Sequence, residues 1–235
     1  MPPTDELTVL VPVDISASET PPLEVIDQLG PSRVVLLGYF PVPRQAEPAL
    51  IKDEYEADAE ARLLEIAEGR PDLTEVLVFT HDREATIDRV ADQYDCDAVL
   101  STGEVDTIER VLVPVRGDVN LERIVSVVAG LLDVSGATAT LFHAVAEGAD
   151  PSQGEFLLRG AVDRLADYGI DESRVDWRLG EGGDPSAEIV ALGGEYDLLV
   201  LGETEPSLVD RIIGDLLSRI VENVERPVLI VRDVE

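Results

Sequence analysis

Cysteine and lysine are nearly absent from this chain, which contains one of each, Cys96 and Lys52. A single cysteine cannot form a disulfide within the chain, so a small extracellular fold held together by disulfides is excluded. No apolar run reaches the roughly 20 residues that a membrane-spanning helix needs. The N-terminus carries neither a basic segment nor an apolar stretch. These absences predict a cytoplasmic protein that is not an integral membrane protein.

Positive charge is also scarce. The chain has 49 acidic residues against 18 lysines and arginines, which gives a net charge of −31 at pH 7. The acidic residues are spread over the chain, as is typical of proteins that stay hydrated in concentrated salt, where screening removes self-repulsion. We therefore predict a halophilic protein. The same charge argues against nucleic acid as a partner, because nucleic-acid binding relies on lysine and arginine neutralising phosphates.

A repeated pentapeptide organises the chain. Val-Leu-Val-Pro-Val occurs as Val9–Val13 and again as Val111–Val115, followed by Asp14 in the first copy and Arg116 in the second. An apolar pentad of this kind is typical of a buried parallel strand that delivers a loop at its carboxyl end. Two copies about 100 residues apart predict two copies of one domain, and the changed residue after the pentad predicts that their roles differ.

Strands and helices alternate along both copies. We place the first copy at residues 1–106 and the second at residues 107–235, where the same order is repeated with an additional last helix and fifth strand. The expected strands are Leu7–Val13, Arg33–Phe40, Glu75–Thr80 and Ala98–Ser101, then Arg110–Val115, Ala139–Val145, Arg174–Arg178, Asp197–Gly202 and Val228–Val231. The expected helices are Leu23–Leu29, Asp53–Glu68 and Ala85–Gln93, then Leu121–Asp133, Gly154–Tyr168, Pro185–Leu192 and Leu208–Val224. This alternation predicts an α/β fold with parallel sheets flanked by helices and a truncated first copy.

The carboxyl ends of the strands are the expected place for a ligand. In open α/β sheets, ligands bind there at the point where the strand order reverses. A phosphate site also needs glycines, because backbone N–H groups have to approach the anion closely. The best candidate is the stretch that begins at Gly202-Glu203 and ends at Gly214-Asp215.

At this point the chain resembles the universal stress protein family. The resemblance covers nearly the whole chain as a tandem pair. It rests on these segments: both Val-Leu-Val-Pro-Val copies, Leu141-Phe142-His143, Asp197–Gly202 and, most specifically, Arg226-Pro227-Val228-Leu229-Ile230-Val231-Arg232. It implies two subdomains of the adenine-nucleotide α-hydrolase type, packed as a pseudo-dimer. It also implies a non-enzymatic role as a stress-response sensor or scaffold.

The resemblance further implies an adenine-nucleotide site, with ATP as the leading ligand. ATP-binding members of the family carry a Gly-x2-Gly-x9-Gly-(Ser/Thr) loop around the phosphates. Gly202 matches the first glycine, Glu205 occupies the second position, and Gly214-Asp215 matches the last pair one residue early. The family's acidic residue after the first strand is matched by Asp14, whereas the second copy has Arg116 there. The implied cleft is lined by Pro114, Val115, Arg116, Gly202, Gly214 and Asp215.

Charge leaves two interpretations of this cleft open. Glu203, Glu205 and Asp215 would oppose a phosphate unless a cation or Arg116 compensates them. Arg116 is suited either to an anionic ligand or to an ion pair with Asp118 or Glu203, and the ion pair is the default interpretation. In the second case the protein acts through protein contacts alone, for example with a membrane transporter.

Other candidate sites have structural explanations. His81 and His143 end strands and are expected to be structural, as is Cys96. The chain has no Ser-His-Asp set, zinc-ligand spacing or Walker loop, so neither catalysis nor a metal is predicted. An enzyme of the wider nucleotide-binding superfamily, such as an ATP pyrophosphatase, remains the alternative from another class. The edge of the last strand, Val228–Val231, is suited to homo-oligomer formation.

Overall fold

The computed structural model describes residues 7–17, 21, 23–28, 32–67, 70, 73–101, 103, 105, 107–117, 120–145, 148, 150–203, 219–221 and 223–233. Contacts between residues divide the chain into two units. Unit 2 takes residues 6–21 and 32–102, and unit 1 takes residues 1–5, 22–31 and 103–235. The segment 22–31 therefore belongs to unit 1 although it lies within the first sequence copy. A domain boundary between residues 106 and 107 stays a prediction.

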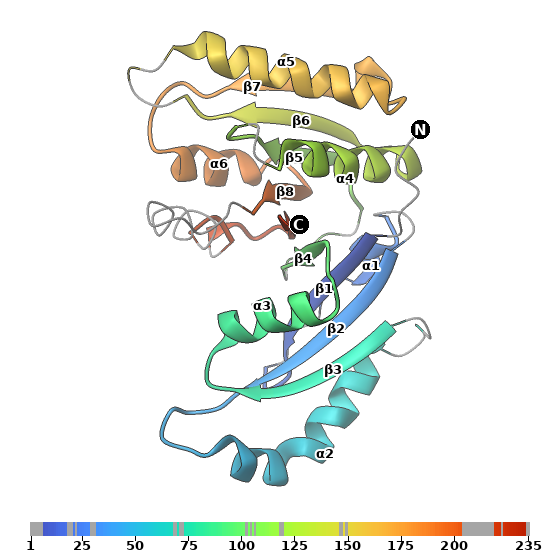
Figure 1. The fold of residues 1–235 in the computed structure, drawn as a ribbon, viewed down its shortest axis with the longest axis vertical. Coiled ribbons are helices and arrows are strands. Elements are labelled where there is room, and N and C mark those ends of the chain that lie inside the picture. The colour runs from blue at the N-terminus through green and yellow to red at the C-terminus, as the bar shows by residue number, and fades with distance from the viewer. Residues whose placement is uncertain are drawn as a thin grey trace. The chain divides into compact units, whose positions relative to one another are not determined.

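Unit 2 is built on four parallel strands among the residues described (Figure 1). In chain order they are β1 (Leu7–Asp14), β2 (Ser32–Pro41), β3 (Leu73–Thr80) and β4 (Ala98–Leu100). Their order in space is β3-β2-β1-β4. The connections run through the helices α2 (Pro48–Ala67) and α3 (Arg83–Gln93). The first pentapeptide is fully buried in β1, as its apolar composition predicts.

The two helices of unit 2 cover opposite faces of its sheet. On one face α3 closes a buried cluster made of Leu10, Val35, Leu37, Val90, Ala91 and Cys96. On the other face α2 packs over Gly38, where an added Cβ would lie 2.7 Å from Ile15 and 3.1 Å from Leu63. Because neighbouring residues of a strand point to opposite faces, Leu37 packs on the α3 side of the sheet and Gly38 lies on the α2 side.

Unit 1 holds five parallel strands among the described residues. They are β5 (Arg110–Pro114), β6 (Thr138–His143), β7 (Val175–Leu179), β8 (Leu198–Gly202) and β9 (Val228–Val231). Their order in space is β9-β8-β5-β6-β7, so the order reverses at β5, with β6 on one side and β8 on the other. The predicted architecture of parallel sheets flanked by helices, shorter in the first copy, is confirmed.

Helices cover both faces of the unit 1 sheet. They are α4 (Leu121–Val134), α5 (Pro151–Asp167) and α6 (Pro185–Gly193). Unit 1 also contains the short helix α1 (Leu23–Ile26) and a 3-10 turn, η1 (Glu172–Arg174). One core cluster joins α6 and Ile220 to the sheet through Leu112, Phe142, Ile189, Leu199, Leu201, Ile220 and Val228. Of the helix predicted over Leu208–Val224, residues 219–221 and 223 are described as helical, and the segment 204–218 lies outside the described residues.

An aspartate fixes the amino end of the first strand in each unit. Asp97 accepts a bond from the Thr8 N–H at 2.8 Å, and its own N–H donates to the Thr8 carbonyl. In unit 1, Asp197 accepts from the N–H groups of Glu109 and Arg110 at 3.0 and 2.8 Å. Both aspartates directly precede the fourth strand of their unit. The repeat therefore extends to the hydrogen bonds at the amino edge of the sheets.

Some predicted elements need correction. The helix α2 begins at Pro48, five residues before the predicted Asp53, because proline suits the first turn of a helix. Its predicted apolar stripe is partly wrong, since Tyr55 is exposed and stacks on Phe40, with the ring centroids 5.4 Å apart. Among the described residues, no helix is long and apolar enough to span a membrane.

Candidate functional site

The end of β5 lies at the switch point of unit 1. The Val115 N–H donates to the Phe142 carbonyl at 2.7 Å, and the Val115 carbonyl accepts from His143 Nδ1, also at 2.7 Å. The Val115 side chain is buried, so this residue anchors the chain and has no free backbone group for a ligand. Arg116 is the first exposed residue after the strand.

His143 is held on two sides. A carbonyl oxygen can only accept, so the Nδ1 that bonds Val115 has to carry the proton. The other edge of the imidazole lies against Gly154 of α5, where an added Cβ would collide with the ring. This geometry fits the predicted structural role. In unit 2, His81 Nδ1 makes a similar contact with the Val42 carbonyl at 3.0 Å.

Gly202 ends β8 where the first turn of α4 approaches the strand. A Cβ at Gly202 would lie 2.5 Å from Cδ1 of Ile124, so a larger residue would force the Ile124 side chain to move whether or not a phosphate binds. Asn120, which precedes α4, has a left-handed backbone with φ of 55° and donates from Nδ2 to the Val231 carbonyl at 3.2 Å. The start of α4 is thus tied to the carboxyl ends of both β8 and β9.

An ion pair follows directly after β8 and β9. Gly202 and Val231 are register partners, and the residues that follow the two strands, Glu203 and Arg232, form an ion pair at 3.6 Å. The Arg232 side chain is only 12% exposed. The structure thus gives Glu203 a partner other than Arg116, whereas the other predicted partner of Arg116, Asp118, lies outside the described residues. Sequence analysis missed Arg232, although the adjacency of the fourth and fifth strands pointed to it.

The remaining predicted site residues differ in status. Pro114 is half-buried at the end of β5. The guanidinium of Arg116 makes no hydrogen bond or ion pair with any residue that the structure describes. Gly214 and Asp215 lie outside the described residues. So do Glu205 and Asp118, the other residues predicted to surround or pair with Arg116.

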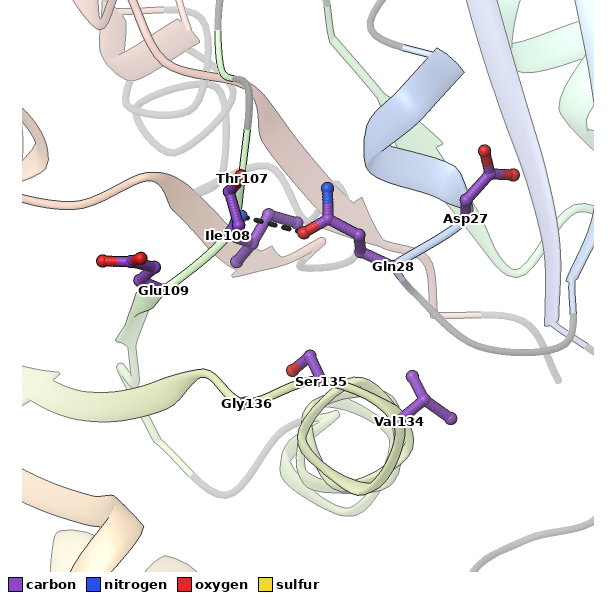
Figure 2. A pocket seen from close by; sticks show the side chains of 8 residues that line it. All are labelled: Asp27, Gln28, Thr107, Ile108, Glu109, Val134, Ser135 and Gly136. Carbon is purple, nitrogen blue, oxygen red and sulfur yellow. Dashed lines mark hydrogen bonds between the residues drawn. The ribbon is translucent and has the colours of Figure 1, made fainter.

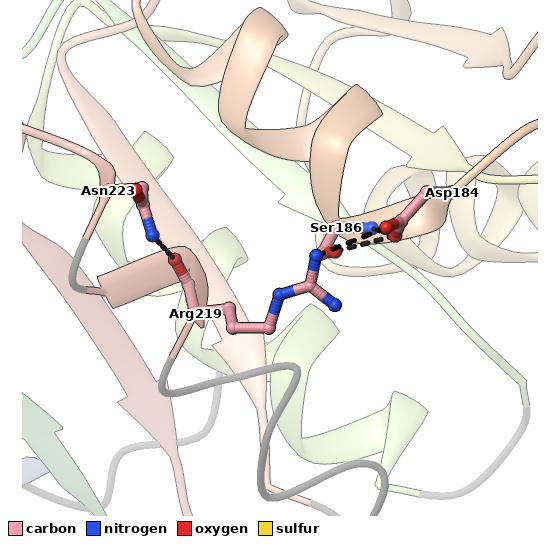
Figure 3. Close-up of polar contacts among 4 residues, drawn as sticks. All are labelled: Asp184, Ser186, Arg219 and Asn223. Carbon is pink, nitrogen blue, oxygen red and sulfur yellow. Dashed lines mark hydrogen bonds and ion pairs between the residues drawn. The ribbon is translucent and has the colours of Figure 1, made fainter.

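A polar cluster joins the loop after β7 to the last helix (Figure 3). Asp184, the N-cap of α6, accepts from the hydroxyl of Ser186 at 2.6 Å and from its N–H at 3.0 Å. Arg219 donates to the same carboxylate at 3.1 Å. The hydrogen bonds from Ser186 are the main reason that the pKa of Asp184 falls from 3.8 to about 2, and Arg219 adds to the effect. The cluster is therefore charged over the whole physiological range.

Glu188 is a residue that sequence analysis missed. Its Oε2 atom is buried and has no hydrogen-bond partner. The carboxylate lies over Gly180, close to Ala144, between the loops that follow β6 and β7. A side chain at position 180 would collide with it. Glycine at 180 thus gives this carboxylate its place at the carboxyl edge.

A cavity of about 550 Å³ lies at the opposite, amino edge of the unit 1 sheet (Figure 2). It is lined by Asp27, Gln28, Thr107, Ile108, Glu109, Val134, Ser135 and Gly136. Gln28 is held there, because its Oε1 accepts from the Ile108 N–H at 2.9 Å. The carboxylates of Asp27 and Glu109 turn away from one another and do not converge on a ligand (Figure 2). Among the described residues, no group of three or more metal-binding side chains comes together.

The fold is similar to those of several solved structures. A universal stress protein from Archaeoglobus fulgidus DSM 4304 is 16% identical, with a TM-score of 0.66 over 97% of both chains. A protein of unknown function from Pseudomonas aeruginosa PAO1 is 15% identical, with a TM-score of 0.54 over 96% of this chain and 92% of its own. A universal stress protein solved in complex with cAMP is 25% identical, with a TM-score of 0.47 over 55% of this chain and all of its own. No curated protein sequence matches significantly.

The family itself is shown by sequence. The model described as the universal stress protein family matches residues 107–232, which is more than half of the chain and includes all five strands of unit 1. The solved structures at 15–16% identity show that the fold extends over both units. The chain belongs to the universal stress protein family.

Proposed function

We propose that this protein is a non-enzymatic ligand sensor. The ligand is a small anion, with an adenine nucleotide as the first candidate, and it binds beyond the carboxyl ends of β5 and β8 in unit 1. Arg116 is the proposed charge partner, and Pro114 and Gly202 form the floor. Gly214 and Asp215, which lie outside the described residues, complete the proposed lining.

The observation that carries this proposal is the guanidinium of Arg116, which bonds to none of the residues that the structure describes. It is exposed at the switch point and has no ion-pair partner among the described residues. An arginine in this position offers a planar set of N–H donors that matches a phosphate or carboxylate. The hydrogen bond from His143 to Val115 supports the proposal further, because it fixes the residue just before Arg116.

The Glu203–Arg232 pair removes part of the electrostatic objection to an anion. The sequence places three carboxylates near the phosphate position, and Glu203 is one of them. Arg232 lies 3.6 Å from Glu203 and compensates its charge in a largely buried position. An anion at this edge therefore meets less repulsion than the count of acidic residues implies.

The non-enzymatic part of the proposal rests on His143. Its Nδ1 is committed to the Val115 carbonyl, and its Nε2 edge lies against Gly154. The ring of His143 is thus held between the end of β5 and the start of α5, which supports a structural role for it.

Isothermal titration tests the proposal. ATP, ADP, cAMP and inorganic phosphate are titrated into the protein in multimolar KCl, the condition that its predicted halophilic character calls for. We expect one of the nucleotides to bind and Arg116→Ala to weaken binding about tenfold or more, as loss of a charged partner costs. Arg33→Ala, which removes an exposed arginine at the start of β2 in unit 2, is the charge-matched control.

The outcomes separate the competing functions. Binding that is unaffected by Arg116→Ala would refute the assignment of the charge partner. Absence of heat with every ligand would favour a scaffold that acts through protein contacts, such as regulation of a membrane transporter. Turnover of ATP during the titration would show an enzyme instead.

A further inference from the structure

The helix α2 of unit 2 has apolar residues on two opposite faces. Ala59, Leu63 and Ala67 are buried, as is usual for a helix that covers one face of a sheet. Leu50 and Leu64, in contrast, are 64% and 57% exposed. A helix that only covers a sheet needs a single apolar face, so the packing of unit 2 does not explain the two exposed leucines.

The exposed apolar residues of α2 form a line along the helix. Leu50, Ala57 and Leu64 are spaced seven residues apart, close to two helical turns, and Ala61 lies one turn from each of the last two. All four residues are exposed. With about 100° of rotation per residue, the line lies opposite the buried face, and it is about 21 Å long. We call these four residues the exposed stripe.

The other long helix of unit 2 has no such stripe. The exposed residues of α3 are all charged or polar apart from Ala85, whereas its larger apolar residues Ile87 and Val90 are half-buried or buried. Two exposed leucines in one line are therefore a property of α2 and not of the surface of unit 2 in general. Exposed apolar side chains gathered in this way mark contact surfaces.

Carboxylates line the exposed stripe. Asp53 and Glu60 follow one side of it, Asp58 lies on the other side, and Glu54 lies within it. All four are exposed and make no ion pair with any residue that the structure describes. The stripe is thus an apolar seam between uncompensated negative charges.

The helix α2 is also more acidic than the other helices. It carries six acidic and two basic residues, a net charge of −4. The same count gives −1 for each of α3, α4, α5 and α6. Its two basic residues, Lys52 and Arg62, pair with Glu56 and Glu65 at 3.1 and 3.7 Å and not with the carboxylates named above. The acidity of the whole chain therefore does not account for the charge along the stripe.

We propose that the exposed stripe of α2 binds a basic amphipathic helix of another protein, in the manner of a two-stranded coiled coil. Apolar side chains of the partner pack on Leu50 and Leu64 and over the two alanines. Lysines or arginines of the partner lie opposite the flanking carboxylates, because charges beside an apolar seam set the choice of partner. A cation opposite Glu54 fixes the register. This site belongs to unit 2 and is independent of the anion site proposed for unit 1.

The charge pattern disfavours other occupants. If α2 paired with α2 of a second copy, the carboxylates of one helix would face those of the other in both the parallel and the antiparallel arrangement. An anionic lipid surface or a nucleic acid would be repelled in the same way. A helix with basic flanks satisfies the apolar seam and the carboxylates together.

Fluorescence anisotropy with a labelled synthetic peptide tests the proposal. The probe is a helical peptide of about three heptads, with leucine at the two seam positions and lysine at the flanking positions. The control peptide keeps the leucines and has glutamate at the flanks. We expect the lysine peptide to bind more tightly than the glutamate peptide, and we expect the difference to narrow as KCl is raised over the range in which the protein stays folded.

Substitutions on α2 locate the binding. Leu50→Gln and Leu64→Gln are each expected to raise the dissociation constant of the lysine peptide about tenfold, because glutamine suits a helix but does not replace the apolar contact. Phe156→Gln, at an 82% exposed phenylalanine of α5 in unit 1, is the matched control and leaves binding unchanged. Glu60→Lys is expected to weaken binding, whereas Asp163→Lys, at an exposed carboxylate of α5, is not.

Three results would overturn the proposal. Failure of the lysine peptide to bind would exclude the proposed partner. Binding that weakens equally in Leu64→Gln and Phe156→Gln, or in neither, would show a general attraction to the acidic surface. A dimer in sedimentation velocity that is lost in Leu64→Gln would assign the stripe to a second copy of the chain.

Discussion

The two units agree at one edge of their sheets and diverge at the other. At the amino edge, Asp97 and Asp197 fix the first strand in the same way. At the carboxyl edge, β1 stays paired with β2 through Asp14 and Tyr39, and the Ile15 N–H continues the pattern by donating to the Tyr39 carbonyl. The corresponding ladder between β5 and β6 is shorter. The amino edge is thus alike in the two units, and the carboxyl edge, where we propose a ligand for unit 1, is not.

His143 causes the difference at the carboxyl edge. The β5–β6 register ends at Pro114 and Phe142, and the imidazole of His143 then takes the Val115 carbonyl. In unit 2 the ladder continues, so Asp14 remains in its strand, where its carboxylate accepts from the N–H and hydroxyl of Ser16 at 2.9 and 2.7 Å. Arg116 follows after its strand has ended. Asp14 and Arg116 thus differ in charge and also in backbone position, since Asp14 lies within a strand and Arg116 lies beyond one.

The largest expected effect compares the aromatic residues near the ends of β2 and β6. Phe142 is fully buried in unit 1, so Phe142→Ala is expected to cost about 3–5 kcal/mol of unfolding free energy. Phe40 is half-buried and stacks on Tyr55 and Phe79, so Phe40→Ala is expected to cost less. Denaturant unfolding in high KCl measures both. Equal losses would contradict the expectation that the more deeply buried Phe142 contributes more to stability than Phe40.

The second effect tests the role of His143 in ending the ladder. His143→Leu leaves the buried Val115 carbonyl without its donor, and we expect a loss of about 1–3 kcal/mol. His81→Leu removes a longer bond at a more exposed residue and is expected to cost less. Hydrogen exchange of the Val115 amide, measured in parallel, is expected to speed up only in His143→Leu. Unchanged exchange there would show that the imidazole does not hold the strand end.

The smallest effect concerns the N-caps of corresponding helices, Asp184 of α6 and Asp82 of α3. The pKa of Asp184 is lowered to about 2, so its carboxylate stabilises the fold above the ordinary value of 3.8 and loses this contribution as pH falls toward about 2. Asp184→Asn is expected to be less stable than the parent protein at neutral pH, with the difference closing over that acidic range. Thermal unfolding against pH measures this.

Asp82 provides the comparison for that experiment. Its side chain caps α3 by accepting from the Ala85 N–H at 3.1 Å, whereas Asp184 accepts from Ser186 twice and from Arg219. Asp82→Asn is therefore expected to change stability less than Asp184→Asn. A larger loss for Asp82→Asn would refute the importance of the cluster around Asp184.

Much of the fold could be predicted because burial leaves a direct signal in the sequence. The two pentapeptides became β1 and β5, and the apolar run before Gly202 became β8. Ends of elements were harder to predict. The strand β6 stops at His143, two residues before the predicted end, because a side chain replaces the backbone donor there. Such a replacement depends on a residue of a neighbouring strand and has no local signature.

The candidate site was less predictable because its residues meet only after folding. The sequence explained the glycine at position 202 only by phosphate binding, whereas its close contact with the Ile124 side chain is a second explanation. Glu203 was assigned to the cleft, and its partner Arg232 lies 29 residues further along the chain. Glu188 gave no signal at all, because its buried position depends on Gly180 in a separate loop.

The placement of residues 22–31 in unit 1 has a consequence for how the chain folds during synthesis. Gln28 bonds to the amide of Ile108, which is 80 residues further along. The segment between β1 and β2 therefore leaves the ribosome well before its partner exists. The segment 22–31 can therefore make its native contacts only after residues near 108 have been synthesised.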